Sequence, residues 1–195
     1  GSYQRTHTPQ VLSFTAPTGA GKTIILASLI ESIYFGDEEY PDQTDAIFVW
    51  LSDSPELNEQ SRSKIDLKAD KIRLNQCVTI TDESFDQEML DNGHIYFLNT
   101  QKLGKSSNLT KKGDGRTFTI WETLQNTMDE KYDRLYFIID EAHHLRNGSM
   151  EKDKAFAYKC VHYFCQHADA VVMLTATPLQ TSDDDLYTLL NLLRP

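Results

Sequence analysis

Residues 16–23 read APTGAGKT, and this stretch decides the fold of the chain. A short apolar run at residues 11–15 (VLSFT) precedes it, and residues 22–35 (KTIILASLIESIYF) continue it at helical spacing. A glycine-containing turn that ends in Gly-Lys-Thr, between a strand and a helix, is the pattern of a phosphate-binding loop. Ala16 stands where the first glycine is usual, but the residues nearest the phosphates are intact. The stretch therefore predicts a nucleoside triphosphate site on an α/β fold.

The chemistry of this loop assigns a role to each part of it. Backbone N–H groups turn inward around a polyphosphate, and the start of the helix adds its positive dipole end. Lys22 is expected to reach the β- and γ-phosphates, and the Thr23 hydroxyl to bind Mg²⁺. The predicted nucleotide-binding residues are Thr18, Gly19, Ala20, Gly21, Lys22 and Thr23.

Strand-like and helix-like segments alternate along the rest of the chain. Strands are expected at residues 11–15, 46–51, 77–80, 94–98, 135–139 and 170–174, and helices at 22–35, 56–69, 118–130, 154–167 and 183–194. Such alternation implies right-handed crossovers and a mostly parallel sheet flanked by helices. The acidic segment between the third and fourth strands has room for a short helix. The pattern leaves the order of the strands open.

The length of 195 residues suits one domain. Residues 1–10 are expected to be a tag remnant and a lead-in, since the chain begins Gly1-Ser2 without a methionine. Residues 11–195 are expected to form the nucleotide-binding domain. Three irregularly spaced cysteines favour a reducing, cytoplasmic location, and no apolar run approaches the ~18 residues that a membrane span needs.

The net charge of −10 argues against nucleic acid covering the whole surface. Positive charge is instead concentrated in residues 101–116 (QKLGKSSNLTKKGDGR). Two Gly, two Ser and an Asp-Gly pair predict a long loop or hairpin there. Any contact with nucleic acid is therefore expected to be local.

A pair of acids follows the apolar run at residues 135–139. Asp140 stands at the carboxyl end of a predicted parallel strand, where ligands of such sheets gather, and is expected to support Mg²⁺. Glu141 is the candidate general base for the attacking water. Together with Lys22, these two acids are the predicted catalytic residues.

Three motifs in order, APTGAGKT, DEAH at residues 140–143 and TATP at residues 175–178, resemble motifs I, II and III of superfamily 2 helicases and translocases. The resemblance covers the chain from about residue 11 to its end and implies the first RecA-like lobe of an ATP-hydrolysing motor. It implies ATP and Mg²⁺ as cofactors. It also implies that His143, Thr175 and Thr177 couple the nucleotide site to a nucleic-acid site.

Two segments match further motifs of that family more loosely. Residues 54–60 (SPELNEQ) resemble motif Ia, and residues 97–103 (FLNTQKL) resemble the Ib region, both of which adjoin the nucleic-acid backbone. A helix cap at the first segment and an exposed turn at the second account for the same residues, so a nucleic-acid contact and a purely structural role both stay open. Contacts of this kind would bind phosphates without reading bases. The candidate DNA-binding residues are Ser52, Pro55, Gln60, Thr100, Lys102 and Lys105.

Within the superfamily, the motif regions resemble the Res/HsdR-like helicase subunits of restriction–modification enzymes, particularly type III. That resemblance implies DNA as a partner, a second RecA-like lobe beyond this chain, and a methyltransferase or specificity subunit. The second lobe supplies the arginine that phosphoryl transfer needs, so this chain alone is expected to turn over ATP very slowly. The alternatives are a Swi/Snf-like motor, another P-loop ATPase without translocation, and a catalytically idle nucleic-acid-binding module.

Overall fold

The computed structural model describes residues 10–15, 21–52, 55–113, 115–140 and 170–175. The strands are β1 Gln10–Thr15, β2 Ile47–Ser52, β3 Cys77–Thr79, β4 Ile95–Asn99, β5 Leu135–Ile139 and β6 Ala170–Thr175. The α-helices are α2 Lys22–Phe35, α3 Pro55–Lys68 and α4 Ile120–Lys131. Short 3₁₀ turns lie at Leu74–Gln76, Thr100–Leu103, Asn108–Thr110 and Tyr132–Arg134. These bounds agree with the expected elements to within a few residues.

The six described strands form one sheet in the order β1-β6-β5-β2-β4-β3, and every neighbouring pair is parallel. Chain order and sheet order differ, because β6 is inserted between β1 and β5. Parallel strands need crossover connections. The helix α2 joins β1 to β2, α3 joins β2 to β3, and α4 joins β4 to β5, whereas turns at residues 81–93 join β3 to β4. The predicted α/β fold with a parallel sheet is therefore confirmed, and the structure adds the strand order that the sequence left open.

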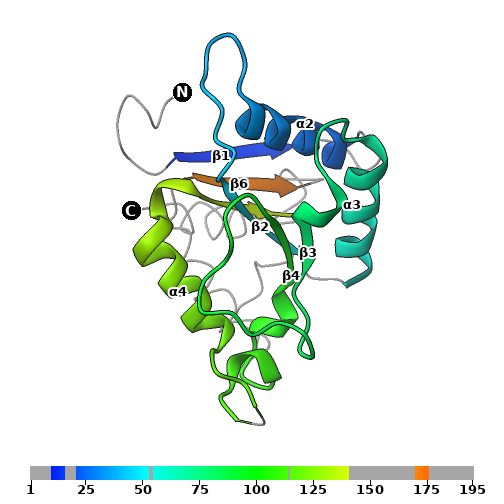
Figure 1. Cartoon of the computed structure of the whole chain (residues 1–195). Helices are drawn as coiled ribbons and strands as arrows, with labels where there is room; N and C mark the ends of the chain where they lie inside the picture. Colours follow the sequence, from blue (N-terminus) through cyan, green and yellow to red (C-terminus); the bar gives the residue numbers. More distant parts are fainter. Residues whose placement is uncertain (1–9, 16–20, 53–54, 114, 141–169, 176–195) are drawn as a thin grey trace, which may run out of the picture.

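Two hydrophobic layers hold the sheet between its helices. On one face, α2 and α3 pack on a cluster that includes Phe48, Trp50 and Phe97. On the other face, α4 packs on a cluster that includes Val49 and Leu98. Figure 1 shows this arrangement, with α2 and α3 on one side of the sheet and α4 on the other. The core is therefore a sheet covered on both faces.

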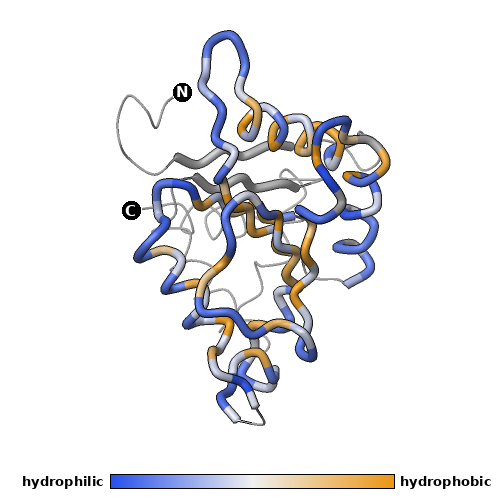
Figure 2. Tube along the Cα trace, viewed as in Figure 1, coloured by the Kyte–Doolittle hydropathy of each residue, from blue (hydrophilic) through white to orange (hydrophobic). Residues whose placement is uncertain are grey.

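The strand β2 shows why the sequence folds this way. All six of its residues are buried, which is the expected state of a central parallel strand covered by helices. Alternate residues serve the two faces, as the pleat of a strand requires. Figure 2 shows hydrophobic residues gathered along the strands and hydrophilic ones on the protruding loop at residues 37–45. The apolar run in the sequence thus corresponds to the middle of the core.

The segment at residues 81–93 forms turns, without the short helix for which it has room. Side chains of α4 bind its backbone instead. Thr127 Oγ1 accepts a hydrogen bond from the N–H of Leu90 at 2.9 Å, Lys131 Nζ donates to the carbonyl of Leu90 at 2.8 Å, and Asn126 Nδ2 donates to the carbonyl of Glu88 at 3.0 Å. These bonds satisfy backbone groups that would otherwise favour a helix of their own.

The basic stretch at residues 101–116 forms two 3₁₀ turns and an antiparallel bridge between Gly113 and Arg116. This agrees with the predicted loop or hairpin. Arg116 donates from its guanidinium to the carbonyls of Phe85 and Asp82. The loop is therefore fastened to the segment at residues 81–93.

Two expected helices, at residues 154–167 and 183–194, lie outside the described residues, as does the lead-in at residues 1–9. Among the helices that the structure describes, none is long and apolar enough to cross a membrane.

Candidate nucleotide and nucleic-acid site

The carboxyl ends of the parallel strands meet along one edge of the sheet. Thr15 of β1 is in register with Thr175 of β6, and Ile139 of β5 is in register with Met173 of β6 and Leu51 of β2. The residues that follow β1 and β5 therefore start from the same edge. This is the edge at which ligands of open parallel sheets bind.

The first described residue of the predicted phosphate loop is Gly21, which caps the N-terminus of α2 in the left-handed conformation, with φ of 75°. Its carbonyl accepts hydrogen bonds from the N–H groups of Ile24 and Ile25 at 2.9 and 3.1 Å. Lys22 and Thr23 form the first turn of the helix and are partly exposed. The turn geometry explains the glycine, because a side chain is disfavoured at positive φ. Lys22 and Thr23 therefore lie at a helix N-terminus, as a phosphate site requires.

Asp140 directly follows β5 and is held by β2 at two points. Its backbone N–H donates to the carbonyl of Leu51 at 2.8 Å, and its Oδ2 accepts a hydrogen bond from the indole Nε1–H of Trp50 at 3.4 Å. The carboxylate is partly buried. Asp140 is therefore an ordered acid at the expected edge.

Four of the predicted residues lie where elements begin or end at this edge. Lys22 and Thr23 begin α2, Asp140 follows β5, and Thr175 is the last residue of β6. The remaining predicted nucleotide and coupling residues are Thr18, Gly19, Ala20, Glu141, His143 and Thr177, and these lie outside the described residues. Their roles stay predictions from the sequence.

Ser52, predicted to lie near nucleic acid, is in the interior. It is 1 % exposed, and its Oγ donates to Asn58 Oδ1 at 2.7 Å. This bond ties the end of β2 to the second turn of α3. Pro55, which opens α3, is exposed. A direct phosphate contact at Ser52 stays a prediction that its burial does not favour, whereas its structural role is plain.

The Ib-like segment is built in a similar way. Asn99 Oδ1 accepts a hydrogen bond from the backbone N–H of Gln101 at 2.9 Å and so caps the 3₁₀ turn that follows β4. Thr100 is 6 % exposed, and Lys102 Nζ lies 3.0 Å from Asp82 Oδ1. Because Ser52 and Asn99 are in register, the ends of β2 and β4 are adjacent. The two looser motifs therefore share one surface.

Most basic side chains of residues 101–116 form ion pairs or hydrogen bonds with other residues of the chain. Lys112 pairs with Glu122 at 2.6 Å, Lys111 donates to the carbonyl of Ser106 at 3.3 Å, and the Arg116 guanidinium binds carbonyls. The Lys112 ammonium and the backbone N–H of Thr119 lower the pKa of Glu122. Lys105 is exposed at the start of the loop. The sequence could not show the partners of Arg116, because these carbonyls belong to a segment more than 30 residues away.

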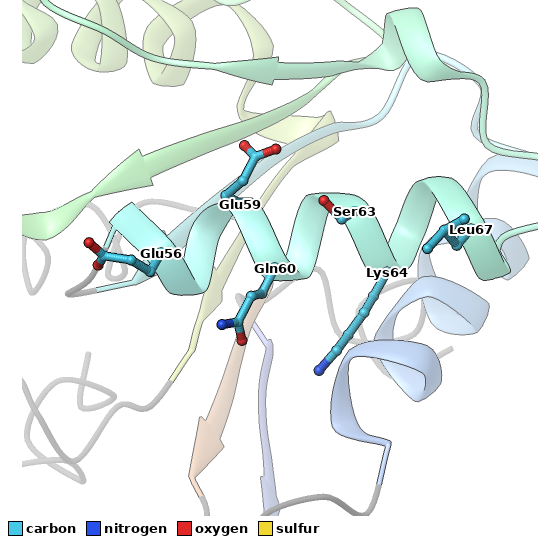
Figure 3. A pocket seen from close by; sticks show the side chains of 6 residues that line it. All are labelled: Glu56, Glu59, Gln60, Ser63, Lys64 and Leu67. Carbon is cyan, nitrogen blue, oxygen red and sulfur yellow. The ribbon is translucent and has the colours of Figure 1, made fainter.

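Gln60 lies on the outer face of α3, where six side chains line an open hollow of about 470 Å³. Figure 3 shows these side chains, which are Glu56, Glu59, Gln60, Ser63, Lys64 and Leu67. Two of the six are carboxylates in the first turns of the helix, and they oppose an approaching phosphate. Lys64 is the one cation of this lining. The face is thus electrostatically mixed.

Sequence reasoning missed four residues that shape the site: Trp50, Asn58, Asp82 and Asn99. Trp50 carried a signal, because an indole N–H inside a run of buried apolar residues must find an acceptor. Asn99 precedes a turn, as capping residues do. Asn58 and Asp82 carried none, since their partners are set by the tertiary fold.

A family model described as the type III restriction enzyme, res subunit, matches residues 3–180 of the chain. Two solved structures of the DUF1998 helicase MrfA are similar, one bound to DNA and the other bound to DNA and AMPPNP. Their TM-scores are 0.57 and 0.58 at 16% identity, and the matches cover 98% and 96% of this chain. This likeness establishes the fold. No curated protein matches the chain.

The chain spans only about a quarter of the length of the solved helicase chains, 25% and 24% respectively. The parallel sheet, the helix that Gly21 caps and the acid after β5 agree with a RecA-like lobe of a helicase-family protein. Since the family match spans most of the sequence, the chain belongs to the family of the type III restriction enzyme res subunit.

Proposed function

We propose that the chain is the ATP-binding motor lobe of a DNA helicase or translocase that couples ATP hydrolysis to movement on DNA, and that it serves as the helicase part of a restriction enzyme. One observation carries the proposal. The end of β1, the start of α2 and Asp140 after β5 all belong to one edge of a parallel sheet. This shared edge supports a single nucleotide site that Lys22, Thr23 and Asp140 would form.

The residues on this edge fit a magnesium nucleotide. The Thr23 hydroxyl and the Asp140 carboxylate are hard oxygen donors, which Mg²⁺ prefers. When bound, Mg²⁺ would neutralise charge on the β- and γ-phosphates. Lys22, in the first turn of α2, would bind the same phosphates, and the helix dipole would add to its attraction. Glu141 is assigned, from the sequence, to orient the attacking water.

DNA is the proposed partner, and its contacts would be with the backbone. Both MrfA structures contain DNA, and the chain shares their fold. In this chain the ends of β2 and β4 lie side by side, so Pro55 of α3 and Lys102 and Lys105 after β4 flank one surface. A methyltransferase or specificity subunit and a second RecA-like lobe are the further partners that the family suggests.

A second candidate, a P-loop ATPase without translocation, is favoured by one observation. Four basic side chains of residues 101–116 bind acids or carbonyls of the chain itself, which lowers the charge available to DNA. In that case ATP binding and hydrolysis would switch the protein between two states without moving it along DNA. Stimulation of ATP turnover by DNA separates the two candidates.

The experiment is a steady-state ATPase assay on the full-length protein, with and without duplex DNA. We expect DNA to stimulate turnover, and we expect Glu141→Gln to abolish turnover while ATP binding is retained, because the base is lost and the phosphate site is intact. Turnover that DNA does not change would favour the switch. No turnover above background in either the wild type or Glu141→Gln would support an idle nucleic-acid-binding module.

A further inference from the structure

Trp50 is a fully buried residue with a polar group, in a strand whose other residues from Ile47 to Leu51 are all apolar. Its ring is 0 % exposed, so the indole N–H is out of reach of water. A buried N–H without an acceptor costs about 1–3 kcal/mol, and phenylalanine would fill the space without that cost. The acceptor is Asp140 Oδ2, at 3.4 Å.

The direction of this N–H is fixed by packing. Trp50 stacks on Phe97 of β4 with ring centroids 5.6 Å apart and an interplanar angle of 30°. Leu26 and Ile30 of α2 belong to the same buried cluster as Trp50, so this helix packs on the face of the sheet that carries the ring. A side chain enclosed by two strands and a helix cannot turn, so the donor is held at one place.

The two predicted ligands of Mg²⁺ belong to this face of the sheet and to the helix that packs on it. Ile138 belongs to the cluster around Trp50, and Asp140, two residues further on, continues that face. The helix α2, which packs on this cluster, carries Thr23 in its first turn. The side chain of Trp50 therefore lies in the layer between the sheet, after which Asp140 follows, and the helix that carries Thr23.

We propose that Trp50 is a positioning residue for Asp140. Its indole N–H donates to Oδ2, and the backbone N–H of Asp140 donates to the carbonyl of Leu51, so the carboxylate is presented to the metal in one orientation. Mg²⁺ demands near-ideal octahedral geometry, so a ligand that is already oriented binds it more tightly. The inference rests on the proposed function, because it assigns Asp140 to magnesium.

The first test is the Mg²⁺ dependence of ATP binding, measured by calorimetry on the chain with Mg²⁺ and with EDTA. Trp50→Phe removes the N–H and keeps an aromatic ring. The matched control is Trp121→Phe, which changes the other tryptophan of the chain, on α4. We expect Trp50→Phe to raise the Mg²⁺ concentration needed for half-maximal binding by about tenfold, in the range for second-shell changes. Binding in EDTA should not change, and Trp121→Phe should change neither value.

The second test needs no nucleotide. The chain has two tryptophans, so Trp121→Phe leaves one indole N–H signal in a ¹H–¹⁵N spectrum. We expect Asp140→Asn in that background to shift this signal, because the acceptor loses its charge. An unmoved signal would overturn the proposed contact, even if Trp50→Phe fails to fold.

The two tests also separate this inference from the proposed function. A chain that binds no ATP, but whose Trp50 signal responds to Asp140→Asn, would contradict the nucleotide site and with it the role toward Mg²⁺. A chain that binds ATP with equal Mg²⁺ dependence in the wild type and in Trp50→Phe would contradict the positioning role alone.

Discussion

Lys102 is the residue at which the fold and the proposed DNA contact compete most directly. Its ammonium lies 3.0 Å from Asp82 Oδ1, and the side chain of Asp82 is 19% exposed while that of Lys102 is 42% exposed. A phosphate that binds Lys102 must displace this carboxylate or share the lysine with it. Asp82 thus weakens any DNA contact made through Lys102.

We predict that Asp82→Asn increases the affinity of the protein for DNA. Pairs of this exposure contribute about 0.2–1 kcal/mol, so the gain in affinity should be about 1.4- to fivefold. Glu83→Gln is the matched control, since it removes one negative charge from the neighbouring, exposed position. Fluorescence anisotropy with labelled duplex DNA at a fixed salt concentration measures both. Equal gains in the two variants would mean that Lys102 does not bind phosphate.

At the scale of elements, the exit from α2 depends on one glycine. Gly36 has φ of 67°, and a Cβ added there would lie 2.7 Å from both the backbone N of Asp42 and the carbonyl of Tyr40. The loop therefore folds back against Gly36 where a side chain cannot fit. Asp37 closes the turn by accepting the N–H groups of Glu39 and Tyr40, both at 2.9 Å.

We predict that Gly36→Ala lowers the free energy of unfolding by about 2 kcal/mol or more, from the positive φ and the clash together. Gly115→Ala is the control, because Gly115 has φ of 89° but no atom within 4 Å of an added Cβ. Gly115→Ala should lower the free energy of unfolding only by the cost of the positive φ, about 1 kcal/mol. Urea unfolding measures both variants. Equal losses of unfolding free energy in the two variants would show that the close contacts around Gly36 contribute nothing.

The dependence of stability on pH at the acidic end involves Asp86, in the segment at residues 81–93, whose carboxylate accepts the backbone N–H groups of Thr117 and Phe118. The backbone N–H groups of Thr117 and Phe118 hold the pKa of this carboxyl below its ordinary value of 3.8. A lowered folded-state pKa stabilises the fold at pH values above 3.8, and this stabilisation is lost as the pH falls through the folded-state pKa.

We therefore predict that Asp86→Asn lowers Tm at neutral pH and that this deficit shrinks below pH 3.8. Thermal unfolding from pH 7 to pH 2 measures the effect. Glu88→Gln, an exposed acid on the same segment, is the control and should leave the profile nearly unchanged. A deficit that stays constant down to pH 2 would contradict the role of the Asp86 charge.

The sequence predicted elements well where one physical signal dominates. Residues 46–51 form an uninterrupted apolar run, and a central parallel strand is its direct consequence. Residues 81–93 show the opposite case. Their conformation is set by Asn126, Thr127 and Lys131 of α4, which are remote in the chain, so no local pattern could reveal it.

At the scale of the whole molecule, the sequence predicted the parallel sheet but not the position of β6 between β1 and β5. That order depends on the packing of whole elements and cannot be read from a local period. It matters for the site, because it separates the end of β1 by one strand from the end of β5, which Asp140 follows. Asp140 and Lys22 were predictable because motif letters mark them, whereas Trp50 and Asp82 act through tertiary contacts.

The lobe is also expected to be incomplete as an enzyme. In the proposed motor, a second lobe contributes the cation that stabilises charge on the γ-phosphate. We predict that the chain alone hydrolyses ATP at a rate that DNA does not raise, measured by phosphate release with and without duplex DNA. Robust DNA-stimulated turnover by these 195 residues would show that no second lobe is needed.

The most direct test of the central claim is calorimetric titration of Mg·ATP into the chain and into Lys22→Ala. Lys64→Ala, on the outer face of α3, is the matched control. We predict that the wild type and Lys64→Ala bind Mg·ATP weakly and one to one. The affinity of Lys22→Ala should be lower by about tenfold or more, because a charge-assisted contact with phosphate is removed. Equal binding by all three proteins, or no binding by the wild type, would contradict an ATP site at the start of α2.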